Sequence, residues 1–178
     1  MTLITPGYLA LNAEQHQMSN GYGERGYKHL DDILHVLRRE DCHSVLDYGC
    51  GKASLAKYAR RVCEVPFANY DPAIPEYAVE PVPVDLVVCT DVLEHVEPAC
   101  IVSVLDHIAS LAEKAVYLQI ATRAAKRTLS NGQNAHILQR DPYWWWNILA
   151  PRFDITDLKV APGHSIVVVA KCRGAIYP

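Results

Sequence analysis

The chain has 178 residues, of which 50% are hydrophobic, and a formal net charge of −3. This length suggests one domain that buries roughly two-thirds of its unfolded surface, and no apolar run is long enough for a membrane span. The small negative charge gives no general attraction to nucleic acid. No secretory signal is visible at the N-terminus, and the six cysteines form no C-x-x-C pair, so we expect reduced thiols and a cytoplasmic location.

The first 40 residues divide into an irregular part and a helical part. Residues 1–23 show no clear hydrophobic period. Between residues 24 and 40, Leu30, Ile33, Leu34 and Leu37 recur at helical spacing and predict an amphipathic helix. We expect residues 1–40 to form a helical cap on a core that spans residues 41–178, all within a single domain.

A glycine turn at residues 44–56 follows the first predicted strand. The order is an apolar run, Asp47, then Gly49-Cys50-Gly51, and residues that favour a helix from near Lys52. This order predicts a strand, a tight turn and a helix whose free N–H groups face the same crevice. A carboxylate at Asp47 would repel a pyrophosphate and attract an ammonium or sulfonium group. A dinucleotide turn places a further glycine where this chain has Ser54.

The second strand is expected over residues 66–70 and ends at Asp71-Pro72. An acid at this position can accept hydrogen bonds from ribose hydroxyls, although an aspartate before proline also serves in turns. Residues 73–83 contain three prolines and therefore argue against a helix. We expect a shortened loop there in place of a regular helix and strand.

The run VDLVVCT over residues 84–90 predicts a buried parallel strand, and DVLEHV follows it over residues 91–96. Asp91 would lie at the carboxyl end of the strand, where doubly wound folds bind ligands. His95 is either a functional residue at this crevice or a histidine satisfied within the core. Glu94 is most simply an acid favoured by the dipole of a helix start.

A helix over residues 98–113 and a strand over residues 115–121 come next. Arg123, Lys126 and Arg127 then follow a strand end, so they either hold a phosphate or carboxylate of a substrate or form a solvated loop.

The polar segment over residues 130–140 contains Asn134 and His136. It is interpreted as the substrate-side wall, with His136 as a second candidate general base; the alternative is that both residues tie the loop down. A tryptophan-rich helix begins near residue 141, and its three adjacent tryptophans cannot share one face. Strands over residues 153–160 and 165–171 close the chain as an antiparallel hairpin.

Three segments together, DYGCGKA, DVLEHV and NAH followed by WWW, resemble the class I S-adenosylmethionine-dependent methyltransferases, especially small phage and bacterial members. The resemblance implies an α/β fold with one doubly wound, mostly parallel, Rossmann-like sheet of six or seven strands. It also implies S-adenosylmethionine as the cofactor. The implied cofactor-binding residues are Asp47, Gly49, Cys50, Gly51, Asp71, Pro72, Asp91 and Val92. The candidate catalytic residues are His95 and His136, and the candidate substrate-binding residues are Arg123, Lys126, Arg127, Asn134 and Trp145.

The sequence does not identify the methyl acceptor. The first interpretation is a small-molecule acceptor, either neutral or anionic. A nucleotide or nucleic-acid methyltransferase would use the three cations and an exposed tryptophan for stacking. A nucleotide-binding oxidoreductase is disfavoured by Asp47 and Ser54, and a non-catalytic partner protein that binds S-adenosylmethionine is a further alternative. The histidines show no ligand-like spacing, so no metal site is predicted, and no oligomeric state is predicted.

Overall fold

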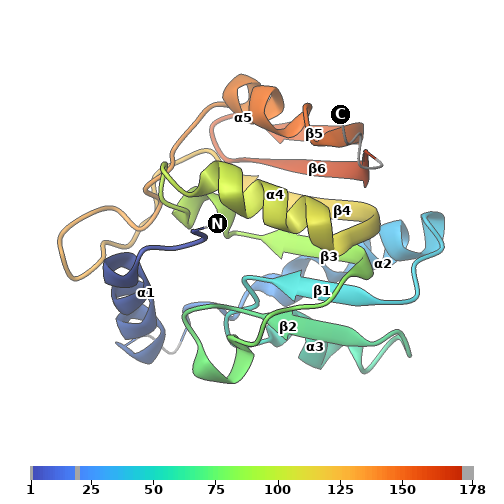
Figure 1. Ribbon diagram of the computed structural model, residues 1–178, viewed down its shortest axis with the longest axis horizontal. Helices are drawn as coiled ribbons and strands as arrows, with labels where there is room; N and C mark the ends of the chain where they lie inside the picture. The colour runs from blue at the N-terminus through green and yellow to red at the C-terminus, as the bar shows by residue number, and fades with distance from the viewer. Residues whose placement is uncertain (1, 19–20, 174–178) are drawn as a thin grey trace.

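The computed structural model describes residues 2–18 and 21–173, and its core is a six-stranded sheet with helices on both faces (Figure 1). The helices are α1 (Pro6–Met18), α2 (Leu30–Arg39), α3 (Ser54–Ala59), α4 (Ile101–Leu111) and α5 (Pro142–Leu149), and the 3-10 turns are η1 (Gly26–His29), η2 (Pro75–Tyr77) and η3 (Leu93–His95). The strands are β1 (Val45–Tyr48), β2 (Phe67–Tyr70), β3 (Val84–Thr90), β4 (Ala112–Ala121), β5 (Phe153–Ala161) and β6 (Ser165–Cys172).

The strand order is β2-β1-β3-β4-β6-β5. The first four strands in this order pair in parallel, whereas β6 is antiparallel to both β4 and β5. The prediction of a doubly wound, mostly parallel sheet that ends in an antiparallel hairpin is confirmed. Six is the lower of the two predicted strand numbers, because residues 73–83 contain only η2, as their prolines lead one to expect.

Alternate residues of the central strands face opposite helices. Val87 of β3 packs with α4 and α5 on one side of the sheet, and its neighbours Leu86 and Val88 pack with α2 and α3 on the other. This two-residue alternation of apolar side chains is what buries β3 on both faces. The two layers hold the carboxyl ends of β1, β2 and β3 in fixed relative positions.

Helix α1 lies within the expected cap of residues 1–40, but no hydrophobic period marked its bounds, because its sequence has no apolar stripe and only Tyr8 and Asn12 are buried along it. It lies beside the carboxyl end of the sheet (Figure 1). Glu97 anchors its start, since the carboxylate accepts hydrogen bonds from the Thr5 backbone N–H and hydroxyl, both at 2.8 Å. Tertiary contacts of this kind, rather than helix periodicity, fix the position of the helix.

None of the helices in the described part of the chain is both long and apolar enough to cross a membrane.

Candidate functional site

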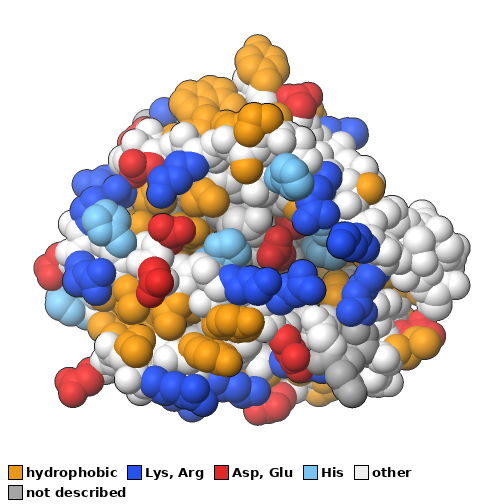
Figure 2. All heavy atoms as spheres, turned by 180° about the vertical axis from the view of Figure 1, so that it is seen from behind, with side chains coloured by type: hydrophobic (Ala, Val, Ile, Leu, Met, Phe, Trp, Pro, Cys, Tyr) orange, Lys and Arg blue, Asp and Glu red, His pale blue; other side chains and the backbone are white. Residues whose placement is uncertain are grey.

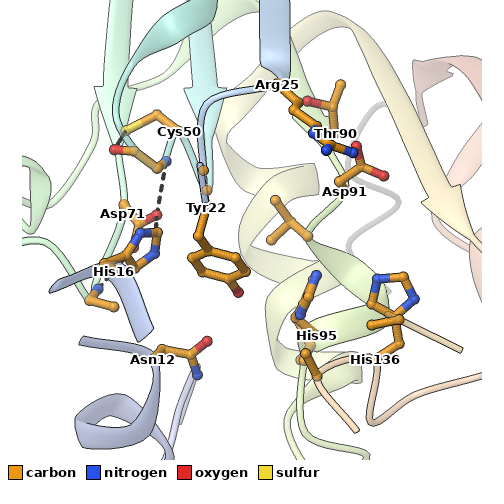
Figure 3. Close-up of a pocket in the computed structure, with 18 of the residues that line it drawn as sticks. Asn12, His16, Tyr22, Arg25, Cys50, Asp71, Thr90, Asp91, His95 and His136 are labelled. Atoms are coloured by element: carbon orange, nitrogen blue, oxygen red, sulfur yellow. Dashed lines mark hydrogen bonds and ion pairs between the residues drawn. The ribbon is translucent and has the colours of Figure 1, made fainter. Parts of the chain in front are cut away.

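A cavity of about 580 Å³ lies at the carboxyl ends of β1, β2 and β3, where α1 and the loop after β4 cover it (Figure 3). Its volume is in the range of about 300–1,000 Å³ that small-molecule sites occupy. The predicted site residues that line it are Asp47, Gly49, Cys50, Gly51, Asp71, Pro72, Asp91, Val92, His95, Arg123, Lys126, Arg127 and His136. The structure therefore brings most of the predicted site into one place.

The turn after β1 requires glycine at two positions. Gly49 has φ +76, and a Cβ there would lie 2.4 Å from Val92 Cγ2. Gly51 has φ +52, and its Cβ would lie 2.6 Å from the Cα of Gly23. Both positions combine a backbone conformation unfavourable for other residues with a close neighbour, so the N-terminal segment packs directly on the turn.

Helix α3 begins at Ser54, later than the predicted start near Lys52. Ala53 has a left-handed backbone with φ 54, which delays the helix. The Lys52 N–H, expected to be free toward the crevice, donates to the Gly23 carbonyl at 2.9 Å. The expectation of free N–H groups from this residue was wrong, because the N-terminal segment supplies an acceptor.

Three acidic side chains lie at the carboxyl ends of three neighbouring strands: Asp71 after β2, Asp47 near the end of β1 and Asp91 after β3. Asp47 is 3% exposed, and burial, followed by the nearby charge of Asp71, raises its pKa to about 7. Asp71 accepts hydrogen bonds from the Gly51 N–H at 3.0 Å and the Ala73 N–H at 2.9 Å. Asp91 has φ +55 and donates its N–H to the Gln119 side-chain oxygen at 3.0 Å. The cavity is thus strongly acidic on this side.

His95 and His136 meet on the other side of the cavity. Their ring centroids are 4.7 Å apart and the rings are nearly perpendicular at 87°. Burial, with a smaller contribution from His136, lowers the pKa of His95 to about 3, so this imidazole is neutral and a weak base near neutral pH. His136 Nδ1 lies 2.6 Å from the Arg123 carbonyl oxygen. That contact assigns the hydrogen to Nδ1 and leaves Nε2 as a proton acceptor.

Glu94 is fully buried beside these histidines, at 0% exposure. Its Oε1 accepts a hydrogen bond from the Ala121 N–H at 3.1 Å and lies 4.0 Å from His136 Nε2. Burial, and then the charge of Asp91, raises the pKa of this carboxyl. The sequence suggested only a helix-start acid here, and no spacing signal links Glu94 to His136.

Two predicted substrate residues do not line the cavity, and these expectations are corrected. The Asn134 side chain accepts from the N–H groups of Ala125 at 2.9 Å and His136 at 3.0 Å, and it donates back to the Ala125 carbonyl. It therefore closes the loop and positions His136. Trp145 is 0% exposed and packs in the core, whereas Trp146 is 41% exposed.

Several cavity residues come from the N-terminal segment, among them Asn12, His16 and Tyr22. Tyr22 stands between His16 and His95, with ring centroids 4.7 Å and 6.0 Å away respectively (Figure 3). His16 Nε2 lies 3.9 Å from Asp71 Oδ2. No local motif marks His16, because α1 reaches the cavity only through the packing of the whole chain.

Surface charge is mixed on the face seen in Figure 2. Several Lys and Arg side chains gather across the middle and right of this face, next to Asp, Glu and His side chains, and hydrophobic side chains lie above and below them. Arg123, Lys126 and Arg127 are exposed and line the cavity, so they add positive charge at its entrance.

The doubly wound sheet and the ligand-sized cavity at its switch point define an α/β protein of the Rossmann-like type. The sequence matches a methyltransferase domain family over residues 20–167, and the chain belongs to that family. A comparison with curated protein sequences gives no match.

Solved structures share this fold at low sequence identity. The Burkholderia thailandensis 1,6-didemethyltoxoflavin-N1-methyltransferase, with bound 1,6-didemethyltoxoflavin and S-adenosylhomocysteine, has a TM-score of 0.67 at 16% identity, and the match covers 98% of this chain and 93% of that chain. The Synechocystis PCC 6803 magnesium protoporphyrin IX methyltransferase with bound SAM has a TM-score of 0.56 at 19% identity, with 87% of this chain and 86% of that chain covered. An rRNA methylase from Escherichia coli has a TM-score of 0.55 at 19% identity, with 96% of this chain and 78% of that chain covered.

Proposed function

We propose that the protein binds S-adenosylmethionine in this cavity and transfers its methyl group to a small acceptor. The observation that carries the proposal is the alignment of Asp47, Asp71 and Asp91 on adjacent strand ends beside a glycine turn. These carboxylates suit a nucleoside that carries a sulfonium and an ammonium group and no phosphate. A pyrophosphate in the same place would lie against three acidic side chains.

The cofactor would lie across the three strand ends. Asp71 would accept hydrogen bonds from the ribose hydroxyls, and Gly49 and Gly51 allow the ligand to approach the backbone closely. Asp47 and Asp91 would face the positively charged end, with Cys50, Pro72 and Val92 as apolar walls. Fold neighbours with bound SAM or S-adenosylhomocysteine support this assignment.

Methyl transfer is a displacement at the methyl carbon, so it depends mainly on alignment and exclusion of water. Of the two candidate bases, His136 presents Nε2 as a proton acceptor, whereas burial makes His95 a weak base. Arg123, Lys126 and Arg127 at the entrance favour an acceptor that carries a carboxylate or phosphate. The toxoflavin and porphyrin methyltransferases among the neighbours support a small acceptor.

A nucleotide or nucleic-acid acceptor is the second candidate. The rRNA methylase neighbour, the same three cations and the exposed Trp146 favour it. A non-catalytic protein that binds S-adenosylmethionine would share the cofactor site and lack transfer to any acceptor.

Calorimetric titration of the purified protein with S-adenosylmethionine, S-adenosylhomocysteine and NAD tests the cofactor. We expect binding of the first two and not of NAD; the reverse pattern contradicts the proposal. Transfer of labelled methyl to a panel of small carboxylates and phosphates, with an RNA arm at low and high salt, then tests the acceptor. We expect His136→Ala to reduce turnover and to leave cofactor affinity unchanged.

A further inference from the structure

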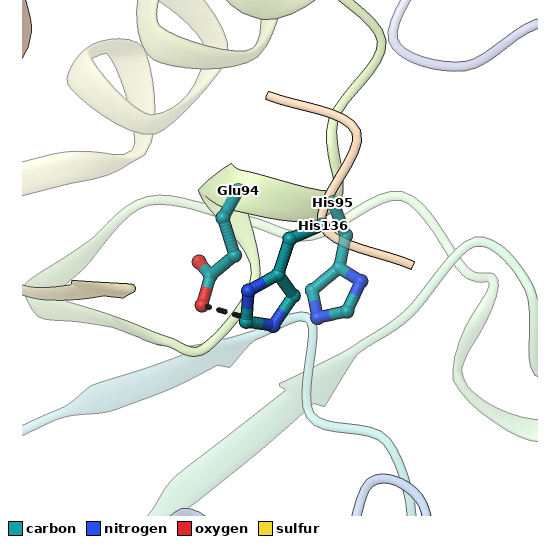
Figure 4. A group of neighbouring side chains, drawn as sticks. All are labelled: Glu94, His95 and His136. Carbon is teal, nitrogen blue, oxygen red and sulfur yellow. Dashed lines mark ion pairs between the residues drawn. The ribbon is translucent and has the colours of Figure 1, made fainter. Parts of the chain in front are cut away.

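Glu94, His95 and His136 form a compact cluster of possible metal ligands next to the cavity (Figure 4). Their ligand atoms all lie within 4.8 Å of one another. Glu94 and His95 are adjacent in η3, and His136 comes from the loop before α5. The fold therefore joins residues whose spacing in the sequence gives no indication of a site.

Each member of the cluster keeps a donor atom available. His136 Nδ1 is used by the Arg123 carbonyl at 2.6 Å, so Nε2 presents its lone pair toward Glu94. Among the described residues, His95 Nδ1 and Glu94 Oε2 are buried and have no hydrogen-bond partner. Metal-binding histidines usually donate their second ring N–H to a carbonyl or carboxylate, and His136 has this arrangement.

The burial of Glu94 is a further reason to consider a bound cation. Glu94 is fully buried, and among the described residues it forms an ion-pair contact with His136, whose Nε2 lies 4.0 Å from Glu94 Oε1. A buried carboxylate is costly unless it is paired or coordinates a metal, and no Lys or Arg of the described chain pairs with it.

We propose that Glu94, His95 and His136 bind one divalent transition-metal ion at the acceptor side of the cavity. Two imidazoles and one carboxylate suit ions such as Zn²⁺ and Co²⁺, whereas Mg²⁺ and Ca²⁺ prefer sets of oxygen ligands. Donor atoms around a tetrahedral ion of this kind lie about 3.3 Å apart, so the side chains close by about 1 Å on binding. Three protein ligands leave a coordination position open, and His95 and His136 line the cavity into which it opens.

The role of the ion rests on the proposed function. An acceptor hydroxyl in the open position would have its pKa lowered by the ion and release its proton to water. Its oxygen then forms the C–O bond as the S–CH₃ bond breaks, and that electron pair stays on sulfur to give S-adenosylhomocysteine. In this arrangement the ion, and not the coordinated His136, promotes loss of the proton.

Metal binding is measured directly on metal-stripped protein, without cofactor or acceptor. Co²⁺ titration is followed by visible absorption and calorimetry, and Zn²⁺ is used to displace it. We expect one equivalent to bind, with affinity at least tenfold weaker in Glu94→Gln and in His136→Ala. His164→Ala, at an exposed turn residue between β5 and β6, should match the wild type.

Glu94→Gln keeps an acceptor for the Ala121 N–H, and circular dichroism of each variant checks that it folds. Absence of stoichiometric Co²⁺ or Zn²⁺ binding, or equal affinity in all variants, overturns the proposal. Binding of Mg²⁺ alone also overturns it, because the donor set would then be misassigned. S-adenosylmethionine titration of the metal-free protein is run separately, so failure of the metal site and failure of the cofactor site give different results.

Discussion

Replacing Asp47 by asparagine should stabilise the ligand-free protein and weaken its binding of the cofactor. Asp47 is 3% exposed, and its pKa is raised from 3.8 to about 7. In the folded protein the carboxyl keeps its proton between these values, whereas the unfolded chain has lost it. The folded state binds more protons in that window, so the wild-type stability falls as the pH rises through it.

The size of this effect follows from the two pKa values. One pKa unit corresponds to about 1.36 kcal/mol. The raised pKa of Asp47 therefore lowers the free energy of unfolding by about 2 kcal/mol at pH 5 and by about 4 kcal/mol at pH 8. The variant Asp47→Asn lacks this ionisation, so its advantage over the wild type should grow between these pH values. Urea denaturation at a series of pH values measures the difference. Glu64→Gln, at an exposed carboxylate in the loop before β2, is the matched control.

The affinity for the cofactor should change with pH in the direction opposite to the stability. A sulfonium or ammonium near Asp47 favours the ionised carboxylate, so wild-type affinity for S-adenosylmethionine should rise with pH through about 7 and release a proton. Asp47→Asn should bind more weakly above pH 7 and lose this pH dependence. A variant no more stable than the wild type at pH 8 would refute the burial argument. An unchanged pH profile of binding would remove Asp47 from the cofactor site.

Three further predictions follow from the geometry. Asp71→Asn should weaken cofactor binding by about 1–3 kcal/mol in calorimetry, because charged hydrogen bonds to the ribose are lost; unchanged affinity would contradict the ribose role. Gly49→Ala should destabilise the fold by at least about 1 kcal/mol in denaturant titration, because φ is +76 and the new Cβ meets Val92 at 2.4 Å; wild-type stability would show that the turn adjusts freely. Trp145→Ala should cost about 3–5 kcal/mol and Trp146→Ala much less, since only the first is fully buried; similar losses would mean that the helix is rotated.

The sheet could be predicted because its strands carry their own signals. The apolar run of β3 begins and ends where the structure places the strand, and the prolines after Asp71 correctly indicated the shortened region. Acids and glycines at strand ends could be placed at one edge for the same reason, since parallel strands end together. The fold and the acidic side of the cavity beside the glycine turn were therefore accessible from local patterns.

The rest depended on contacts between distant segments. Helix α1 has no apolar face, so its place over the cavity follows from contacts such as Thr5 with Glu97. Three adjacent tryptophans do not indicate which face of the helix packs on the core, so the burial of Trp145 could not be predicted. The meeting of Glu94 with His136 requires the loop after β4 to fold back, which no spacing rule encodes.

The position of β6 between β4 and β5 has a consequence for biosynthesis. β6 is the last strand of the described chain, and both of its neighbours are made before it. While the chain emerges from the ribosome, the backbone N–H and C=O groups along one edge of β4 have no partner strand until residues 165–172 are synthesised. Pairing between segments far apart in the chain is slow to form, so nascent chains stalled before Ser165 should be more prone to aggregation than the finished chain.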